Sequence, residues 1–328
     1  MYGAILGDMI GAPYEFDRGD KRKDFPLFSA ASEFTDDTVI SIAVVEAMMD
    51  SFEKSDDEVK EALVRSLQKW GHCYPDAGYG YMFSDWLHSV NPKPYGSCGN
   101  GSAMRVSSIG WLYDTLEQTR HYARLSAEIT HNHPEGIKGA EATASAIFLA
   151  HHAKNKSEIR DYVSHEFGYD LSRSCDKIRP DYHHVETCQQ TVPEAITAFL
   201  EGNDFEDVIR TAVSLGGDAD TLTCIAGGIA EAYYDVPDAL KTECRKRLPN
   251  DLLAVLDRFT SIQDDETLCP VCGEHHFQMV GGFEICPICD WEDDPYQRWY
   301  PDEYEVANHM SLNEARRRWK KYRDLSQE

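Results

Sequence analysis

Helical patterns follow one another through the first 260 residues of this 328-residue chain, and no run of alternating strands interrupts them. Small residues recur along several of these stretches, most densely between Gly139 and Ala146, which favours close packing of helix on helix. The expected fold of this part is therefore an all-α, compact multi-helix domain. The helical patterns cover, in chain order, 39–49, 55–70, 116–129, 137–152, 205–215 and 222–234, and a further helix is expected to open at 191–194.

The charge balance excludes some partners. The formal net charge is −25, from 57 acidic and 32 basic residues. Such a chain lacks the broad positive surface that nucleic acid or anionic lipid attracts, although a local pocket can oppose the global field. Asp8 interrupts the N-terminal apolar run too early for a signal peptide, and no apolar stretch is long enough for a membrane helix. We expect a cytoplasmic protein that does not enter membranes.

The ten cysteines fall into two groups. Six are scattered through the first 250 residues, whereas Cys269, Cys272, Cys286 and Cys289 form two C-x-x-C pairs. Paired spacing of this kind presents four thiolates to one structural Zn²⁺, and a reducing compartment disfavours the alternative of disulfides. Composition also changes at an acidic segment, 261–268, which we expect to be a hinge. The sequence thus predicts a domain at 1–260 and a small, zinc-ribbon-like β/α domain at 265–328.

Two short acidic segments each stand immediately before an apolar helical pattern. The first is Thr35-Asp36-Asp37-Thr38 and the second is Gly216-Gly217-Asp218-Ala219-Asp220-Thr221. Helix capping explains one such side chain per segment, but each segment supplies two carboxylates and a hydroxyl. If the two segments meet, their oxygen atoms form a cage of the kind that Mg²⁺ or Mn²⁺ prefers. Taken alone, the residues leave capping and metal binding open.

Five segments, taken together, resemble a known family. They are Gly3-Ala4-Ile5-Leu6-Gly7-Asp8-Met9-Ile10-Gly11-Ala12-Pro13-Tyr14-Glu15-Phe16, Phe34-Thr35-Asp36-Asp37-Thr38, Gly99-Asn100-Gly101-Ser102-Ala103-Met104-Arg105, Thr130-His131-Asn132-His133-Pro134 and Ser214-Leu215-Gly216-Gly217-Asp218-Ala219-Asp220-Thr221. In this order they resemble the motifs of the ADP-ribosylglycohydrolase family over roughly residues 2 to 250. The resemblance implies an all-α fold with a binuclear metal centre.

The resemblance also implies roles for individual residues. Two Mg²⁺ or Mn²⁺ ions would be held by Thr35, Asp36, Asp37, Asp218, Asp220 and Thr221. Glu15 would orient the attacking water or gate a metal, and would act with the four aspartates in catalysis. The ligand would contact Gly99, Asn100, Gly101, Ser102, Met104 and His131.

The C-terminal segment resembles a second family, the cysteine-rich CPCC domain, over about 269–319. The resemblance rests on Glu284-Ile285-Cys286-Pro287 and Trp291-Glu292-Asp293-Asp294, and it departs at Val271, where the family name implies another cysteine.

The expected function is hydrolysis of the glycosidic bond between ADP-ribose and a modified acceptor, a protein side chain or another ADP-ribosyl conjugate. The alternative is a non-catalytic ADP-ribose-binding protein whose zinc domain recruits a protein partner. The acceptor itself stays open, and a nucleic-acid target, though not indicated by the charge, is one of the possibilities.

Overall fold

The structure, a computed structural model, describes residues 1–52, 54–304 and 307–325. The chain divides into two compact units, Met1–Leu256 and Asp257–Glu328. One helix, α14 (Asn250–Thr267), includes the junction between them, so the acidic segment expected to be a hinge is helical through Thr267. The boundary predicted between residues 260 and 265 therefore falls inside a helix. Residues 326–328 of the predicted C-terminal domain lie outside the described part of the chain.

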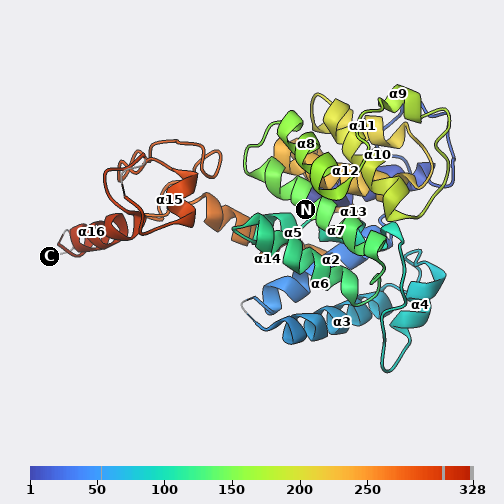
Figure 1. The fold of residues 1–328 in the computed structure, drawn as a ribbon, viewed down its shortest axis with the longest axis horizontal. Coiled ribbons are helices and arrows are strands. Elements are labelled where there is room, and N and C mark those ends of the chain that lie inside the picture. The colour runs from blue at the N-terminus through green and yellow to red at the C-terminus, as the bar shows by residue number, and fades with distance from the viewer. Residues whose placement is uncertain (53, 305–306, 326–328) are drawn as a thin grey trace. The chain divides into compact units, whose positions relative to one another are not determined.

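All the named elements in the described residues of unit 1 are helices, which confirms the predicted fold class (Figure 1). They are α1 (Tyr2–Gly11), η1 (Ala12–Tyr14), α2 (Asp36–Asp50), α3 (Asp56–Cys73), α4 (Tyr81–Leu87), η2 (Asn100–Ser102), η3 (Met104–Val106), α5 (Ile109–Leu112), α6 (Leu116–Glu128), α7 (Pro134–His151), α8 (Lys156–Phe167), α9 (Cys175–Ile178), α10 (Cys188–Glu201), α11 (Phe205–Val213), α12 (Ala219–Tyr233), α13 (Asp238–Arg247) and the first part of α14.

Helix α10 begins three residues earlier than the sequence predicted. Thr187 is its N-cap, and the Thr187 carbonyl accepts the backbone N–H of Thr191 at 2.9 Å. Thr187 also pairs with Gly99 in an isolated antiparallel bridge, which fixes where the helix starts. As a result Pro193, expected in the first turn, lies inside the helix.

The core of unit 1 is built around α12, which packs against α1, α7, α10 and α11. Every residue of α12 from Ala219 to Ala230 is buried. Its contact with α1 is closest at glycines: a Cβ added at Gly7 would lie 2.2 Å from the carbonyl oxygen of Thr223, and one at Gly11 would lie 2.4 Å from that of Ala219. This close approach brings the C-terminal end of α1 to the first turn of α12.

We expect Gly7→Ala to lower the free energy of unfolding by about 3 kcal/mol, because the new methyl group meets backbone atoms that cannot move separately from α12. Gly228→Ala is the matched control, since the nearest atom to its added Cβ is the Ser107 Cβ at 3.3 Å. That change should alter stability by no more than about 1 kcal/mol. Urea denaturation of both variants measures the difference, and equal stabilities would contradict the close packing of α1 on α12.

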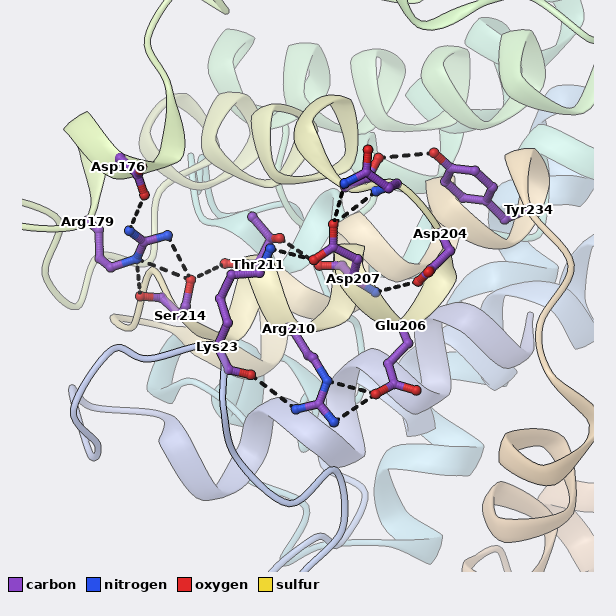
Figure 2. A network of polar contacts seen from close by, with 12 residues as sticks. Lys23, Asp176, Arg179, Asp204, Glu206, Asp207, Arg210, Thr211, Ser214 and Tyr234 are labelled. Atoms are coloured by element: carbon purple, nitrogen blue, oxygen red, sulfur yellow. Dashed lines mark hydrogen bonds and ion pairs between the residues drawn. The ribbon is translucent and has the colours of Figure 1, made fainter.

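The irregular connection between η1 and α2 is held against α11. Arg210 of α11 donates from Nη1 to the carbonyl oxygens of Lys23 at 3.1 Å and Phe25 at 2.7 Å, and from Nε to Glu206 at 2.8 Å (Figure 2). Lys23 in turn pairs with Asp207. These contacts anchor the connection that leads from the end of α1 to the first acidic turn.

Unit 2 contains two C-x-x-C turns, Cys269–Cys272 and Cys286–Cys289, which we call knuckles. It also contains the end of α14, the short helix α15 (Pro295–Trp299) and the helix α16 (Leu312–Leu325). The knuckles share one geometry: the residue after the second cysteine donates its N–H to the carbonyl of the first, Gly273 to Cys269 and Asp290 to Cys286, each at 2.9 Å. Both donors have positive φ, 67° and 57°. The β pairing in the described residues of this unit is limited to two isolated bridges, 268 with 276 and 285 with 292.

Candidate metal and ligand site

The first acidic turn starts α2 and is fixed by a buried carboxylate of α1. Thr35 caps the helix, its hydroxyl oxygen accepting the N–H of Asp37 at 3.3 Å. Asp8, which is fully buried, accepts the Thr35 hydroxyl at 2.7 Å, the Thr35 N–H at 2.9 Å and the Thr38 N–H at 3.1 Å. Asp36 donates its backbone N–H to the Ala77 carbonyl at 2.8 Å. This turn therefore has a rigid backbone and two carboxylates in its first helical positions.

The role of Asp8 was missed by the sequence analysis, which used this residue only to exclude a signal peptide. The available signal was a charged side chain in the middle of an otherwise apolar and glycine-rich helix. A carboxylate buried there needs several donors, and the threonines on both sides of Asp36-Asp37 supply them.

The second acidic turn depends on two glycines in the left-handed region, Gly216 (φ 74°) and Gly217 (φ 75°). A Cβ at Gly217 would lie 2.8 Å from the carbonyl oxygen of His183, so a larger residue would also displace that segment. Asp17 accepts the Gly217 N–H at 3.0 Å. The turn then delivers Asp218 to the N-cap of α12, with Asp220 in its first turn.

An arginine positions the residue that precedes this turn. The Arg179 guanidinium donates from Nε to the carbonyl oxygen of Ser214 at 3.1 Å, and it pairs with Asp176 on α9 (Figure 2). Arg179 thus connects α9 to the end of α11, where the chain turns towards Gly216.

The two acidic turns meet. The Thr221 hydroxyl donates to Asp37 Oδ2 at 3.0 Å across 184 positions of sequence. The four aspartates at positions 36, 37, 218 and 220 line one cavity, together with Thr221 and Glu15. Thr35 is the exception among the predicted metal ligands: its hydroxyl donates to Asp8, and it does not line the cavity. Metal ligation by Thr35 remains a prediction.

Burial and mutual repulsion raise the pKa of every carboxyl in this cluster. Burial, and next the charge of Asp220, raise the pKa values of Asp36 and Asp37 well above the ordinary value. The same causes raise the pKa of Asp8 and of Glu15 to about 7, and burial raises that of Asp218 to about 6.

The cluster has the donor set for hard cations. Asp37 Oδ1 is buried and has no hydrogen-bond partner among the described residues, although a buried carboxylate oxygen normally has one. Bound divalent cations would supply that partner and remove the repulsion among the carboxylates. Carboxylate and hydroxyl oxygens are the ligands that Mg²⁺ and Mn²⁺ take. The residues present therefore fit such ions.

The loop from Gly99 to Met104, which is expected to contact the ligand and is called the ligand loop here, borders the same cavity. Asn100 links it to the cluster, since its Nδ2 donates to Asp218 Oδ2 at 2.6 Å and its backbone N–H donates to the Glu186 carbonyl at 2.8 Å. Gly99, Gly101, Met104 and His131 also line the cavity, which has a volume of about 380 Å³. Ser102 does not line it, because its hydroxyl is turned inward to the Gly136 carbonyl at 2.8 Å. A ligand role for Ser102 stays a prediction.

His131 closes this side of the cavity. It is buried, its Nδ1 lies 2.8 Å from the Thr130 hydroxyl, and burial lowers its pKa well below the ordinary value. A neutral ring can donate or accept a hydrogen bond without placing a charge beside the ligand. Added Cβ atoms at Gly99 and Gly101 would lie 3.3 Å and 3.2 Å from His131 Nε2, so the loop packs closely on the ring at both glycines.

A second residue missed by the sequence analysis is His184, to which it gave no role. One of its ring nitrogens and one carboxylate oxygen from each of Glu15 and Asp218 lie within 4.8 Å of one another. No spacing pattern connects these residues, so the sequence held no signal for this contact.

The four cysteines of unit 2 converge as well. Cys269 Sγ lies 3.4 Å from Cys289 Sγ, and Cys272 Sγ lies 3.6 Å from Cys286 Sγ. All four thiols are free, and their sulfur atoms lie within 4.8 Å of one another. Sulfur atoms about 2.3 Å from a tetrahedral Zn²⁺ would be about 3.8 Å apart, so this arrangement fits one zinc ion. Phe277, Trp291 and Leu312 pack around the cluster and cover it with apolar side chains.

Comparison with known proteins gives two family matches. Residues 1–268 match the ADP-ribosylglycohydrolase family, and residues 267–327 match the cysteine-rich CPCC family. ADP-ribosylhydrolase ARH3 from Homo sapiens is 27% identical, with 77% of this chain and 90% of that protein covered. ADP-ribosylarginine hydrolase Tri1 from Pseudomonas putida is 25% identical, with 72% and 70% covered. A solved structure described as an ADP-ribosylglycohydrolase-related protein complex superposes with a TM-score of 0.56 at 22% identity, over 79% of this chain and 95% of that chain, which shows a shared fold.

No helix in the described part of the chain is both long and apolar enough to cross a bilayer.

Proposed function

The chain belongs to the ADP-ribosylglycohydrolase family, and we propose that it hydrolyses the glycosidic bond that joins ADP-ribose to a modified acceptor, with two divalent cations held by the acidic turns. The observation that carries this proposal is the meeting of the two turns at one cavity. Thr221 contacts Asp37 directly, and the ligand loop reaches the same cluster through Asn100. Relatives named for hydrolysis of ADP-ribosyl groups support the reaction class.

The proposed ligands of the two ions are the aspartates at positions 36, 37, 218 and 220, with the hydroxyls of Thr35 and Thr221. When bound, Mg²⁺ or Mn²⁺ would supply Lewis acidity at the ribose and lower the pKa of nearby water. The loop from Gly99 to Met104 and the ring of His131 would hold the ADP-ribose moiety, since they line the cavity beside the carboxylates. Glycines there allow the backbone to approach a phosphate closely.

Glu15 is the proposed general base. Its carboxyl lines the cavity, and burial, together with the charge of Asp220, raises its pKa to about 7. That value belongs to the site without cations, and the charge of bound cations would lower it and keep the carboxylate ionised. An ionised carboxylate at this position can accept a proton from water. It would take the proton of the attacking water while positive charge develops at the anomeric carbon of the ribose.

A non-catalytic ADP-ribose-binding protein, whose zinc domain recruits a partner, is the competing function. The presence of all six proposed ligands and of Glu15 favours the enzyme. The proposed setting is the reducing cytoplasm, where the free thiols of both units persist. The acceptor would be an ADP-ribosylated protein or another ADP-ribosyl conjugate.

Metal removal tests the proposal directly. The full chain, with zinc retained in unit 2, is treated with a panel of substrates carrying ADP-ribose on arginine, on serine, on a nucleic-acid base or on a small molecule. We expect release of free ADP-ribose from at least one substrate in Mg²⁺ or Mn²⁺, and a loss of at least about 10³-fold without divalent cations. Binding of ADP-ribose without turnover of any substrate would favour the non-catalytic function instead.

A further inference from the structure

His184 is held in a fixed orientation at the edge of the carboxylate cluster. Its ring Nε2 lies 2.9 Å from Glu186 Oε1, and its backbone N–H donates to Asp17 Oδ2 at 3.1 Å. The ring also packs on Phe16, with the two centroids 4.6 Å apart. These contacts fix the position and orientation of the ring.

The other ring nitrogen has no partner. Nδ1 of His184 is buried and makes no hydrogen bond to any described residue. In the tautomer that donates from Nε2 to Glu186, Nδ1 carries a lone pair. Since carboxylate oxygens of Glu15 and Asp218 lie within 4.8 Å of a ring nitrogen, a cation bound to Asp218 could also contact the His184 ring, with Glu15 beside it.

The surrounding contacts match those of a histidine that binds a metal. Such a histidine usually donates its second N–H to a carboxylate, which fixes the ring and makes the ligating nitrogen more basic. Glu186 is in the place of that carboxylate. Asn100 orients the site from the other side, because it donates to Asp218 Oδ2 and to the backbone carbonyl of Glu186.

We propose that His184 is a ligand of one of the two cations, together with Asp218 and beside the Glu15 carboxylate, and that Glu186 positions its ring. This inference rests on the proposed function for the existence of the cations. A nitrogen ligand changes the preference of the site. Imidazole suits Mn²⁺ and the later first-row transition metals, whereas Mg²⁺ prefers oxygen alone. The site therefore discriminates in favour of Mn²⁺ over Mg²⁺.

Pulsed electron paramagnetic resonance of bound Mn²⁺ tests this assignment without using activity. The full chain is first loaded with Zn²⁺ in unit 2 and then titrated with Mn²⁺. We expect a ¹⁴N coupling from a directly bound imidazole, lost in His184→Gln. The Kd for Mn²⁺ at this position should rise at least about tenfold in that variant, and Mg²⁺ binding should change less.

His183→Gln is the matched control. His183 is the neighbouring histidine, but its side chain is 73% exposed. This variant should keep both the ¹⁴N coupling and the Mn²⁺ affinity. Glu186→Gln should weaken Mn²⁺ binding while the coupling remains, because the ring loses its orienting carboxylate but not its ligating nitrogen. If His184→Gln fails to fold, His184→Asn provides the same comparison.

The outcomes separate this inference from the proposed function. Two bound Mn²⁺ ions and normal turnover, without a ¹⁴N coupling that depends on His184, would overturn the histidine ligand and leave the hydrolase proposal intact. Binding of Mg²⁺ but not of Mn²⁺ would overturn the histidine ligand alone, and failure to bind either ion would overturn both.

Discussion

Replacing Asp220 by alanine is expected to lower the rate of ADP-ribose release by at least about 10³-fold while the fold is kept. Asp220 is buried in the first turn of α12, and its charge contributes to the raised pKa values of Asp36, Asp37 and Glu15. It thus lies close to every other carboxylate of the cluster, and its loss removes one of the proposed ligands. In the metal-free protein the same change relieves repulsion, so the melting temperature should stay equal or rise.

Asp238→Ala is the control for this experiment. Asp238 begins α13 and its side chain is 99% exposed, so its removal should change neither turnover nor stability. The measurement is single-turnover release of ADP-ribose at saturating Mg²⁺ or Mn²⁺. Retained turnover in a folded Asp220→Ala protein would exclude the acidic cluster as the site of the reaction.

Removal of zinc from the four-cysteine cluster is expected to unfold unit 2 and leave hydrolysis in unit 1 largely intact. Structural zinc contributes about 10 kcal/mol or more to folding of a small domain. The core of unit 2 is small and consists largely of the cysteines and the side chains around them, including Phe277, Trp291 and Leu312. Among the described residues, those that line the carboxylate cavity belong to unit 1.

Cys286→Ser tests this prediction without a chelator. Cys286 is fully buried, and its thiol lies 3.6 Å from that of Cys272. The variant should lose zinc and the near-ultraviolet signal of Trp291, whereas Cys73→Ser, at an exposed free thiol, should lose neither. Parallel losses of zinc and of hydrolysis, with Mg²⁺ or Mn²⁺ restored, would mean that unit 2 is an integral part of the enzyme.

The fold class could be predicted because each helix carries its own local signal. The pattern at 55–70, for example, corresponds to α3, whose start is fixed by a capping box of Ser55 and Glu58. The start of α10 was wrong by three residues because it depends on the bridge from Thr187 to Gly99, which no local pattern reveals. The acidic segment 261–268 is polar enough for a hinge, yet it continues α14.

The site was accessible from sequence only where its residues stand in short motifs. The two acidic turns and the ligand loop are such motifs, and the structure brings them to one cavity. Asp8 and His184 do not belong to any such motif. Asp8 reaches the cluster through the packing of α1 on α12, and His184 reaches it through the segment that packs on Gly217. The orientation of a hydroxyl is also set by tertiary contacts, which is why Ser102 lies outside the cavity lining.

Calorimetric titration of the zinc-loaded full chain with Mn²⁺ tests the central claim most directly. If the two acidic turns together hold a pair of ions, the titration should give two equivalents of Mn²⁺ for each wild-type chain and fewer for Asp220→Ala. Binding of neither Mn²⁺ nor, in a parallel titration, Mg²⁺ by the wild-type chain, or equal binding by both proteins, would contradict it.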